Sequence, residues 1–391
     1  MMNSSSMTLD APPTPLPERA LQATLTGGLA ALGVFLPYST AGTSIALGML
    51  MLVALAMAPR VWRLRPWREP MFAIGLALLA YIAARSIAAG WDRSAAGVVN
   101  HYHELLLMPV LWALFTLCPR RDAFVWGLLA GSVGLAVAHW IPLSAEVTTK
   151  VELRRISAGF GLSVAAFILF EQGRLGRMAK VIAYPAAAFL AFTVVAAVGA
   201  RTGYVAVALF GAFAAWRAAP GRWRWAAVVG VLVSAVVVAS LLSSMREKRG
   251  DIANSNKIRT ELLRNTTEVI RDHWLVGTGW VGYAGAYEAV AAARGAPPDA
   301  YYAKSANPHN EYLMQWAAGG LPALALYAAW LAAPLVRGWR RRGEAGAYAS
   351  SAACVAVAFA VASALNSMLL DFTEAHFYAA AMAWLLARRD P

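Results

Sequence analysis

The sequence predicts an all-α polytopic membrane protein with about twelve transmembrane helices and one large loop, itself helical, on the outer side of the membrane. Three observations lead to this prediction. Hydrophobic residues fill 59% of the 391 positions and charged residues only 14%, against about a quarter charged in soluble globular chains. The mean hydropathy is +0.53. The apolar residues gather in runs close to the ~20 residues that a helix needs to cross a bilayer.

The apolar runs divide the chain into four parts. Residues 1–19, rich in Ser and Pro, are expected to be a disordered cytoplasmic tail, since they lack the basic start and cleavage site of a removable signal. Nine transmembrane helices are predicted within 20–243, a large outer loop at 244–308, and three more helices within 309–391. The expected spans are 20–38, 41–58, 70–89, 103–118, 122–141, 158–172, 181–199, 203–216, 225–243, 310–336, 347–366 and 370–387.

The basic residues indicate the orientation of the chain, because short loops rich in Lys and Arg remain on the cytoplasmic side. Alternate short loops hold only Arg93 and Arg201. The other loops hold sixteen basic residues, which are Arg60, Arg63, Arg65, Arg68, Arg120, Arg121, Arg174, Arg177, Lys180, Arg217, Arg222, Arg224, Arg337, Arg340, Arg341 and Arg342. Both termini are therefore predicted to be cytoplasmic. The formal charge of +13 arises largely in these turns, where it contacts anionic membrane lipids, and nucleic-acid binding is not expected.

One helix is expected inside the large outer loop. Residues 256–274 read NKIRTELLRNTTEVIRDHW, in which apolar residues recur at helical spacing on one face. Lys257, Arg264 and Arg271 recur every seven residues on another face, and the first two have a glutamate four positions on. Arg259 lies outside that series, which leaves it freer to bind a ligand.

Several catalytic patterns are missing or out of context. Gly277, Gly279 and Gly282 have the spacing of a dinucleotide-binding fingerprint, but no strand precedes them, so a tight turn beneath the next segment is expected instead. The sequence has no His-Glu-x-x-His motif, no P-loop, no Gly-x-Ser-x-Gly and no Asp-x-Asp. No cofactor and no metal site is therefore expected. Cys118 and Cys354 fall at or within predicted helices, so no disulfide is expected in the outer loops.

The arginines at the outer helix ends are candidates for a binding site, because ionisable groups at the edge of the hydrocarbon are costly and by default functional. Arg201 is the only charge in the tight turn before the helix at 203–216. It either contacts lipid phosphates as a snorkelling side chain or grips an anionic oxygen bidentately. Arg154 and Arg155 hold the equivalent position before the helix at 158–172, with the same two interpretations open.

His309 stands where the large loop returns to the membrane. Histidine changes charge near neutral pH, which suits a general base, although a lone histidine is also common as a structural residue. Asn310 is placed to orient it. Asp371, at the start of the last helix, either neutralises an arginine, holds the tautomer of His309 or, more simply, caps the helix. Further polar residues at outer helix ends have no assigned role: Asn366, Glu374, His376, His103 and Glu104.

Together these features resemble the O-antigen ligases, a family of polytopic glycosyltransferases of the bacterial inner membrane, within the superfamily that also holds the O-antigen polymerases. The most specific element is a His-Asn pair followed after nine residues by Gly-x-x-(Gly/Thr/Tyr). His309 and Asn310, then EYLMQWAAG, then Gly320-Leu321-Pro322 match this pattern, and Ala323 departs at its last position.

Two further segments carry the resemblance. Arg201 in ARTGYVAVAL resembles the family's Ser-Arg-Gly element, with Ala200 and Thr202 in the flanking places. The stretch RTELLRNTTEVIRDHWLVGTGWVGY, which begins at Arg259, resembles a family segment that runs from an arginine through a helix to a glycine turn, with Trp274 where proline is usual. The likeness covers most of the chain from about residue 20.

The resemblance implies a metal-independent, GT-C-like transfer of O-antigen from undecaprenyl diphosphate to lipid A–core on the periplasmic face of the inner membrane, in lipopolysaccharide biosynthesis. His309 would be the catalytic base. Arg201, helped by Arg154, Arg155 or Arg259, would hold the diphosphate and stabilise the leaving charge. Asn310 and Asp371 would support substrate binding. Direct displacement would invert the anomeric configuration.

Other functions stay open. An O-antigen polymerase or a protein O-oligosaccharyltransferase would use the same donor and similar arginines with a different acceptor, and the lack of a large soluble C-terminal domain is taken to favour the ligase. A transporter of lipid-linked glycans would bind and release its cargo with the arginines and would have little need for a base at His309. A purely structural membrane protein is the remaining alternative.

Overall fold

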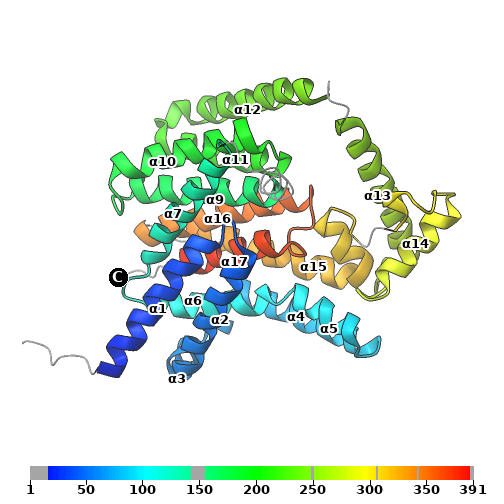
Figure 1. Cartoon of the computed structure of the whole chain (residues 1–391), viewed down its shortest axis with the longest axis horizontal. Coiled ribbons are helices and arrows are strands. Elements are labelled where there is room, and N and C mark those ends of the chain that lie inside the picture. Colours follow the sequence, from blue (N-terminus) through cyan, green and yellow to red (C-terminus); the bar gives the residue numbers. More distant parts are fainter. Residues whose placement is uncertain (1–15, 142–154, 248–250, 305–306, 341–342, 388–391) are drawn as a thin grey trace, which may run out of the picture.

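The computed structural model describes residues 16–141, 155–247, 251–304, 307–340 and 343–387 (Figure 1). These residues contain sixteen α-helices, short 3₁₀ and π turns between some of them, and no strand. The prediction of an all-α protein is therefore confirmed for the described part of the chain.

Each of the twelve predicted apolar runs coincides with a helix. These helices are α1 Leu16–Phe35, α2 Thr40–Ala56, α4 Pro70–Ala88, α6 Glu104–Leu117, α7 Ala123–Ala138, α9 Arg155–Arg174, α10 Lys180–Thr193, α11 Arg201–Ala218, α12 Arg224–Glu247, α15 Glu311–Arg340, α16 Gly343–Ser363 and α17 Phe372–Leu386. Four other helices are α3 Ala58–Arg63, α5 Arg93–His101, α13 Asp251–His273 and α14 Tyr283–Ala293. Of these four, only α13 was predicted as a helix, over 256–274.

Six helices are long and apolar enough to cross a membrane: α4, α9, α10 with the turn after it, α12 with the turn before it, α15 and α16. A seventh is added if α2 and the segment after it, bent by 79° from it, count as one span. α6 and α7 are apolar but shorter. The chain is therefore a multi-pass membrane protein by its apolar helices, and length and composition alone give six or seven spans where twelve were predicted.

Three helices form the centre of the bundle. α17 is buried from Glu374 to Leu386, and α9 and α16 are buried along most of their lengths. A helix that is buried all round needs other helices on every side, and α17 packs against α6, α16 and α9. Aromatic rings fill the space between them: the Phe359 and Tyr378 centroids lie 4.0 Å apart, and those of Trp330 and Tyr378 lie 5.2 Å apart.

The ends of four helices are tied together on the side that carries the basic loops. Glu171, near the end of α9, is buried and accepts Arg174 at 2.8 Å and Arg217 of α11 at 3.3 Å. Arg337, near the end of α15, donates to the carbonyl of Leu386 in α17 at 3.0 Å. These contacts join the last turn of α9 to that of α11, and the last turn of α15 to that of α17. The first turns of the same helices therefore lie at the opposite end of the bundle.

The large loop packs on a break in α15. Gly320 has φ +68° and ψ −167°, which glycine adopts freely. After α13, the backbone N–H groups of Thr278 and Gly279 donate to the carbonyls of Ala317 and Ala318 at 2.9 and 2.8 Å. Gly277 has φ +70° and lies so close that a Cβ on it would be 2.4 Å from the Ala318 oxygen. The tight-turn interpretation of these glycines is therefore confirmed. Figure 1 places α13 and α14 beside the first part of α15, at one end of the molecule.

Candidate active site

His309 lies in a short turn between the large loop and α15. Its φ of +50° is uncommon for a residue that carries a side chain. The side chain of Asn307 holds the turn, because it accepts the N–H of His309 at 2.8 Å and the hydroxyl of Ser367 at 2.6 Å. Backbone strain of this kind costs about 1–3 kcal/mol and collects at functional sites. The turn fixes the imidazole against the loop that joins α16 to α17.

A chain of hydrogen bonds runs from the His309 ring to Asp371. Nδ1 of His309 lies 3.1 Å from Oδ1 of Asn366, and Nδ2 of Asn366 donates to the Asp371 carboxylate. An ionised carboxylate only accepts, so Asn366 turns its NH₂ toward Asp371 and its carbonyl toward the histidine. The carbonyl requires a proton on Nδ1, which leaves the lone pair on Nε2. Nε2 lies 3.3 Å from the hydroxyl of Tyr301. The His309 ring is therefore held with its Nε2 lone pair facing the Tyr301 hydroxyl.

The two residues expected to assist His309 are placed differently from one another. Asn310 begins α15: its side chain accepts the N–H of Leu313 at 3.1 Å and donates to the carbonyl of Ala364 at 3.1 Å. The amide that contacts the imidazole belongs to Asn366, so the expectation that Asn310 orients the ring is corrected. Asp371 occupies the N-cap position of α17 but makes no side-chain cap hydrogen bond. Three roles were open for Asp371. The hydrogen bonds favour the one in which Asp371 holds the His309 tautomer through Asn366.

Two of the predicted arginines lie close to this relay. Arg259, on α13, is partly buried and donates through Nη1 to the carbonyl of Leu365 at 2.9 Å, directly before Asn366. Arg201, the first residue of α11, is exposed and donates through Nη2 to Oδ1 of Asn256 at 2.9 Å. Burial, and then the charge of Arg201, lower the pKa of Arg259, yet guanidinium stays protonated in proteins. Within the described residues neither guanidinium forms an ion pair with a carboxylate, so both charges are available to an anion.

The starts of α9 and α11 meet beside these arginines. Gly159 and Gly203 let the two helices touch: a Cβ on Gly159 would lie 3.3 Å from Cα of Gly203. Arg155, the first residue of α9, is exposed one turn before that contact. Arg154 lies outside the described residues. The helix starts add their partial positive charge to that of the arginines, so this end of the bundle is suited to a phosphate group.

Four residues of the site had no role assigned from the sequence. Asn366, Tyr301, Asn307 and Ser367 contact His309 or hold its turn. None of them is charged, and Asn366 and Ser367 lie more than 50 residues along the chain from their partners His309 and Asn307. The one usable signal was the polar pair Asn366-Ser367 between two apolar runs, which is unusual at the end of a membrane helix.

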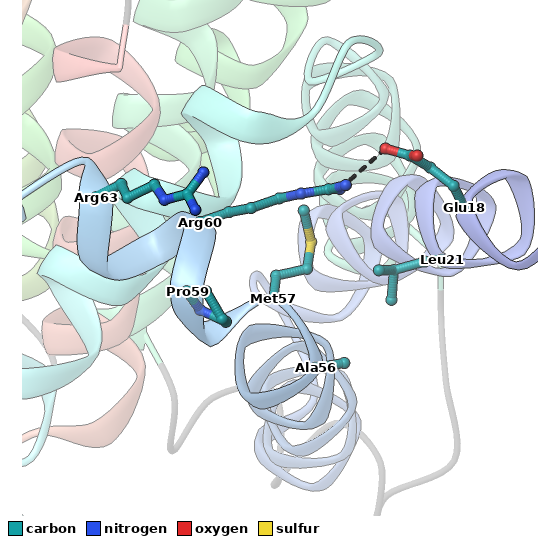
Figure 2. Close-up of a pocket in the computed structure, with 7 residues that line it drawn as sticks. All are labelled: Glu18, Leu21, Ala56, Met57, Pro59, Arg60 and Arg63. Carbon is teal, nitrogen blue, oxygen red and sulfur yellow. Dashed lines mark ion pairs between the residues drawn. The ribbon is translucent and has the colours of Figure 1, made fainter.

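One cavity leads to this site and another lies away from it. An apolar groove of about 420 Å³ runs between α15 and α16, lined by Tyr312, Leu331, Ala360, Val361 and Ala364 among others. At one end of the groove, the carbonyl of Ala364 accepts a hydrogen bond from the Asn310 side chain. The groove therefore ends beside the turn that holds His309. A second hollow, of about 380 Å³, lies where α1 meets α2 and α3, and Figure 2 shows its Glu18–Arg60 ion pair of 3.0 Å. It contains none of the predicted site residues.

Comparison with known proteins agrees with the motifs. Residues 186–328 match the family model described as O-antigen ligase. The match includes α11 with Arg201, α13 with Arg259, and the His309 turn with the broken first half of α15. The domain is shared with O-antigen polymerases and related enzymes. No curated protein matches the chain.

Proposed function

Since the chain carries an O-antigen ligase domain, and members of that family transfer glycans, we propose that it is the ligase itself. It moves O-antigen polysaccharide from undecaprenyl diphosphate to lipid A–core on the periplasmic face of the bacterial inner membrane, as a step of lipopolysaccharide biosynthesis. The observation that carries the proposal is the His309–Asn366–Asp371 relay beside two arginines without carboxylate partners in the described part of the chain.

In the proposed reaction the acceptor sugar hydroxyl attacks the anomeric carbon of the donor. Nε2 of His309 takes the hydroxyl proton while the oxygen–carbon bond forms, and the bond from that carbon to the diphosphate oxygen breaks with its electron pair on the oxygen. A positioned base of this kind contributes typically ~10²–10⁴ in rate. The single displacement inverts the anomeric configuration, in the manner of GT-C-like enzymes.

Arg201 and Arg259 bind the diphosphate in this proposal, and Arg155, at the start of α9, assists. Arg154, which the sequence also suggested for this role, lies outside the described residues. Guanidinium groups form paired hydrogen bonds with phosphate oxygens and stabilise negative charge as it develops on the leaving group. They therefore supply the charge that a divalent ion supplies at many nucleotide-sugar sites. The transfer step is proposed to require no metal at the reacting atoms.

The arrangement of the bundle supports a lipid-linked donor. The apolar groove between α15 and α16 ends at Ala364, beside the His309 turn, which is where an isoprenoid chain would run if its diphosphate lay at the arginines. The basic helix ends lie opposite the site and are proposed to be cytoplasmic. In this topology all twelve apolar helices cross the membrane. Among them α6, α7 and α17 are shorter than the ~20 residues that a helix usually needs for this.

The nearest alternative is an O-antigen polymerase or a protein O-oligosaccharyltransferase, which would use the same base and arginines with another acceptor. The family match does not separate them from a ligase. A transporter of lipid-linked glycans is less favoured, because a cargo site has no need for the oriented Nε2 of His309.

Reconstituted protein tests the proposal directly. Wild type in buffer without added divalent ions is expected to transfer glycan from undecaprenyl diphosphate to purified lipid A–core. His309→Ala should lose ~10²–10⁴ in rate with donor binding kept, and Arg259→Ala and Arg201→Ala should bind the donor less tightly. Arg264→Ala is the matched control. Arg264 lies on α13, as Arg259 does, but its side chain is exposed and pairs with Glu261 at 3.3 Å.

Each other outcome points elsewhere. Longer lipid-linked glycan without transfer to lipid A–core would identify a polymerase. Transfer that proceeds equally well in the His309 variant would remove the base from the mechanism while leaving the ligase in place.

A further inference from the structure

A second cluster of ionisable side chains lies where the start of α6 meets α17. His103 directly precedes α6, Glu104 is its first residue, and His376 lies in the second turn of α17. One ligand atom from each of the three residues lies within 4.8 Å of those of the other two. Nδ1 of His376 is 3.1 Å from Oε1 of Glu104, and the centroids of the two imidazole rings are 4.9 Å apart.

Two buried atoms of this cluster have no hydrogen-bond partner in the described part of the chain. Glu104 is 3% exposed and His376 is 2% exposed. Oε2 of Glu104 and Nε2 of His376 have no hydrogen-bond partner in the described part of the chain. Leaving a buried polar atom unsatisfied costs about 1–3 kcal/mol, and more for a charged one. Oε1 of Glu104 is the oxygen that faces Nδ1 of His376, and Oε2 lies 3.8 Å from Nδ1 of His103, beyond hydrogen-bond distance.

Each of the two imidazoles contacts a backbone carbonyl through Nδ1. Nδ1 of His103 contacts the carbonyl of Asn100, and Nδ1 of His376 lies 2.7 Å from the carbonyl of Phe372. A carbonyl contact places the proton on Nδ1 and the lone pair on Nε2. Metal ligands of this type commonly donate their second N–H to a backbone carbonyl. The His103 side chain is 34% exposed, which gives an ion a path into the cluster.

We propose that His103, Glu104 and His376 bind a divalent transition-metal ion of the zinc class. Two imidazoles and one carboxylate form a ligand set that zinc uses, with a fourth position left for water. Magnesium and calcium take oxygen ligands instead. The site has no sequence motif because His376 comes from a helix far along the chain, which is why no metal was expected from the sequence.

The ion would connect the start of α6 to α17. His376 lies five residues after Asp371, which is about 7 Å along a helix. The ion would therefore hold the second turn of α17, the helix that begins after Asp371. It touches neither His309 nor either arginine of the proposed reaction. The inference is therefore separate from the proposed function and describes a structural ion.

Zinc content of the full-length protein tests the inference. Wild type is exposed to Zn²⁺ in detergent, passed into metal-free buffer by gel filtration, and measured by elemental mass spectrometry. We expect about one ion per chain in wild type and little in Glu104→Gln or His376→Gln, since each removes one ligand. His139→Gln is the matched control and should keep its zinc: Nδ1 of His139 also lies on a carbonyl, at 2.9 Å, and its Nε2 is also unpartnered, but it is outside the cluster.

The thermal unfolding midpoint gives a second measurement. Added Zn²⁺ should raise it in wild type and in His139→Gln and leave it unchanged in Glu104→Gln. If the buried variants do not fold, His103→Gln replaces them, because His103 is partly exposed. Wild type that holds no zinc and is not stabilised by it would overturn the proposal in favour of a buried water between the same atoms. Full zinc retention in the Glu104 variant would also overturn it. Neither measurement depends on glycan transfer.

Discussion

Asn366 determines the direction of the His309 ring. It lies between an imidazole and a carboxylate and contacts both. A side-chain amide can accept through its carbonyl on one side and donate through its NH₂ on the other. A leucine of similar size would leave both neighbours without a partner, and an aspartate would place a second negative charge beside Asp371.

The first prediction concerns this residue. Asn366→Leu is expected to lower kcat for glycan transfer by roughly tenfold to a hundredfold, with little change in the KM for the lipid-linked donor. The loss reaches only the lower end of the ~10²–10⁴ that a positioned base contributes, because the base itself is still present. Steady-state transfer rates measure both constants. Asn310→Ala is the control, because Asn310 caps α15; it should cost about 1 kcal/mol of stability and leave kcat near the wild-type value. Equal kcat in the two variants would contradict the relay.

The sequence singles out residues by their charge, and this limits what it predicts at the site. His309, Arg201 and Arg259 stand out because a charge or an imidazole at the membrane edge is costly. Asn366 and Tyr301 are neutral, and their contacts to His309 exist only once α16 and the large loop are folded. Asn310 is expected to orient the ring only because it follows His309 in the sequence. In the structure the contact with the His309 ring comes from Asn366, which lies beyond α15 and α16 along the chain.

At the scale of elements, the break in α15 joins the large loop to the bundle. Gly320 opens the helix, and the turn at Gly277 enters the gap with two backbone hydrogen bonds. Tyr81 and Arg85 of α4 add bonds to the carbonyls of Gly319 and Gly277 at 2.9 and 3.2 Å. The first part of α15, which follows His309 directly, is therefore held from both sides.

Two glycine substitutions test this junction. Gly277→Ala is expected to destabilise the protein by more than the ~1–3 kcal/mol of backbone strain alone, because its Cβ would also overlap the Ala318 carbonyl. Gly285→Ala, in the first turn of α14 with no atom within 4 Å of its Cβ, is expected to stabilise by up to about 0.5–1 kcal/mol. Thermal unfolding in detergent compares the two. A Gly277 variant as stable as wild type would show that the loop and α15 are not mechanically joined.

At the scale of the whole molecule, one end of the bundle carries the relay and the other carries the basic loops. The positions of the helices followed from the apolar runs, since each run must bury its backbone polar groups in helical hydrogen bonds inside a membrane. The short helices α5 and α14 were not predicted, because they are neither long nor strongly apolar. Neither was the pairing of α17 with α6 and α9, which depends on shapes that a single sequence does not display.

The orientation of the bundle gives the third prediction. Arg222→Cys and Asp299→Cys both place a thiol at an exposed position, the first between α11 and α12 and the second in the large loop. A membrane-impermeant maleimide added outside the inner membrane should label Asp299→Cys and not Arg222→Cys, because the basic loop is expected to be cytoplasmic. The wild-type background should be low, since Cys118 and Cys354 are buried. Labelling of Arg222→Cys from outside would reverse the proposed topology.

The backbone conformation of His309 is unfavourable for a histidine. Its φ of +50° is a conformation that glycine or asparagine adopts more easily than histidine does. In the proposed reaction His309 is the base, so a histidine is kept there at a cost in stability, because activity and stability commonly conflict at active sites. A gene copy released from selection for glycan transfer would be expected to drift toward glycine or asparagine at position 309, and its product would fold more stably as it lost its base. Natural variation at this single position would thus record whether a lineage still uses the enzyme.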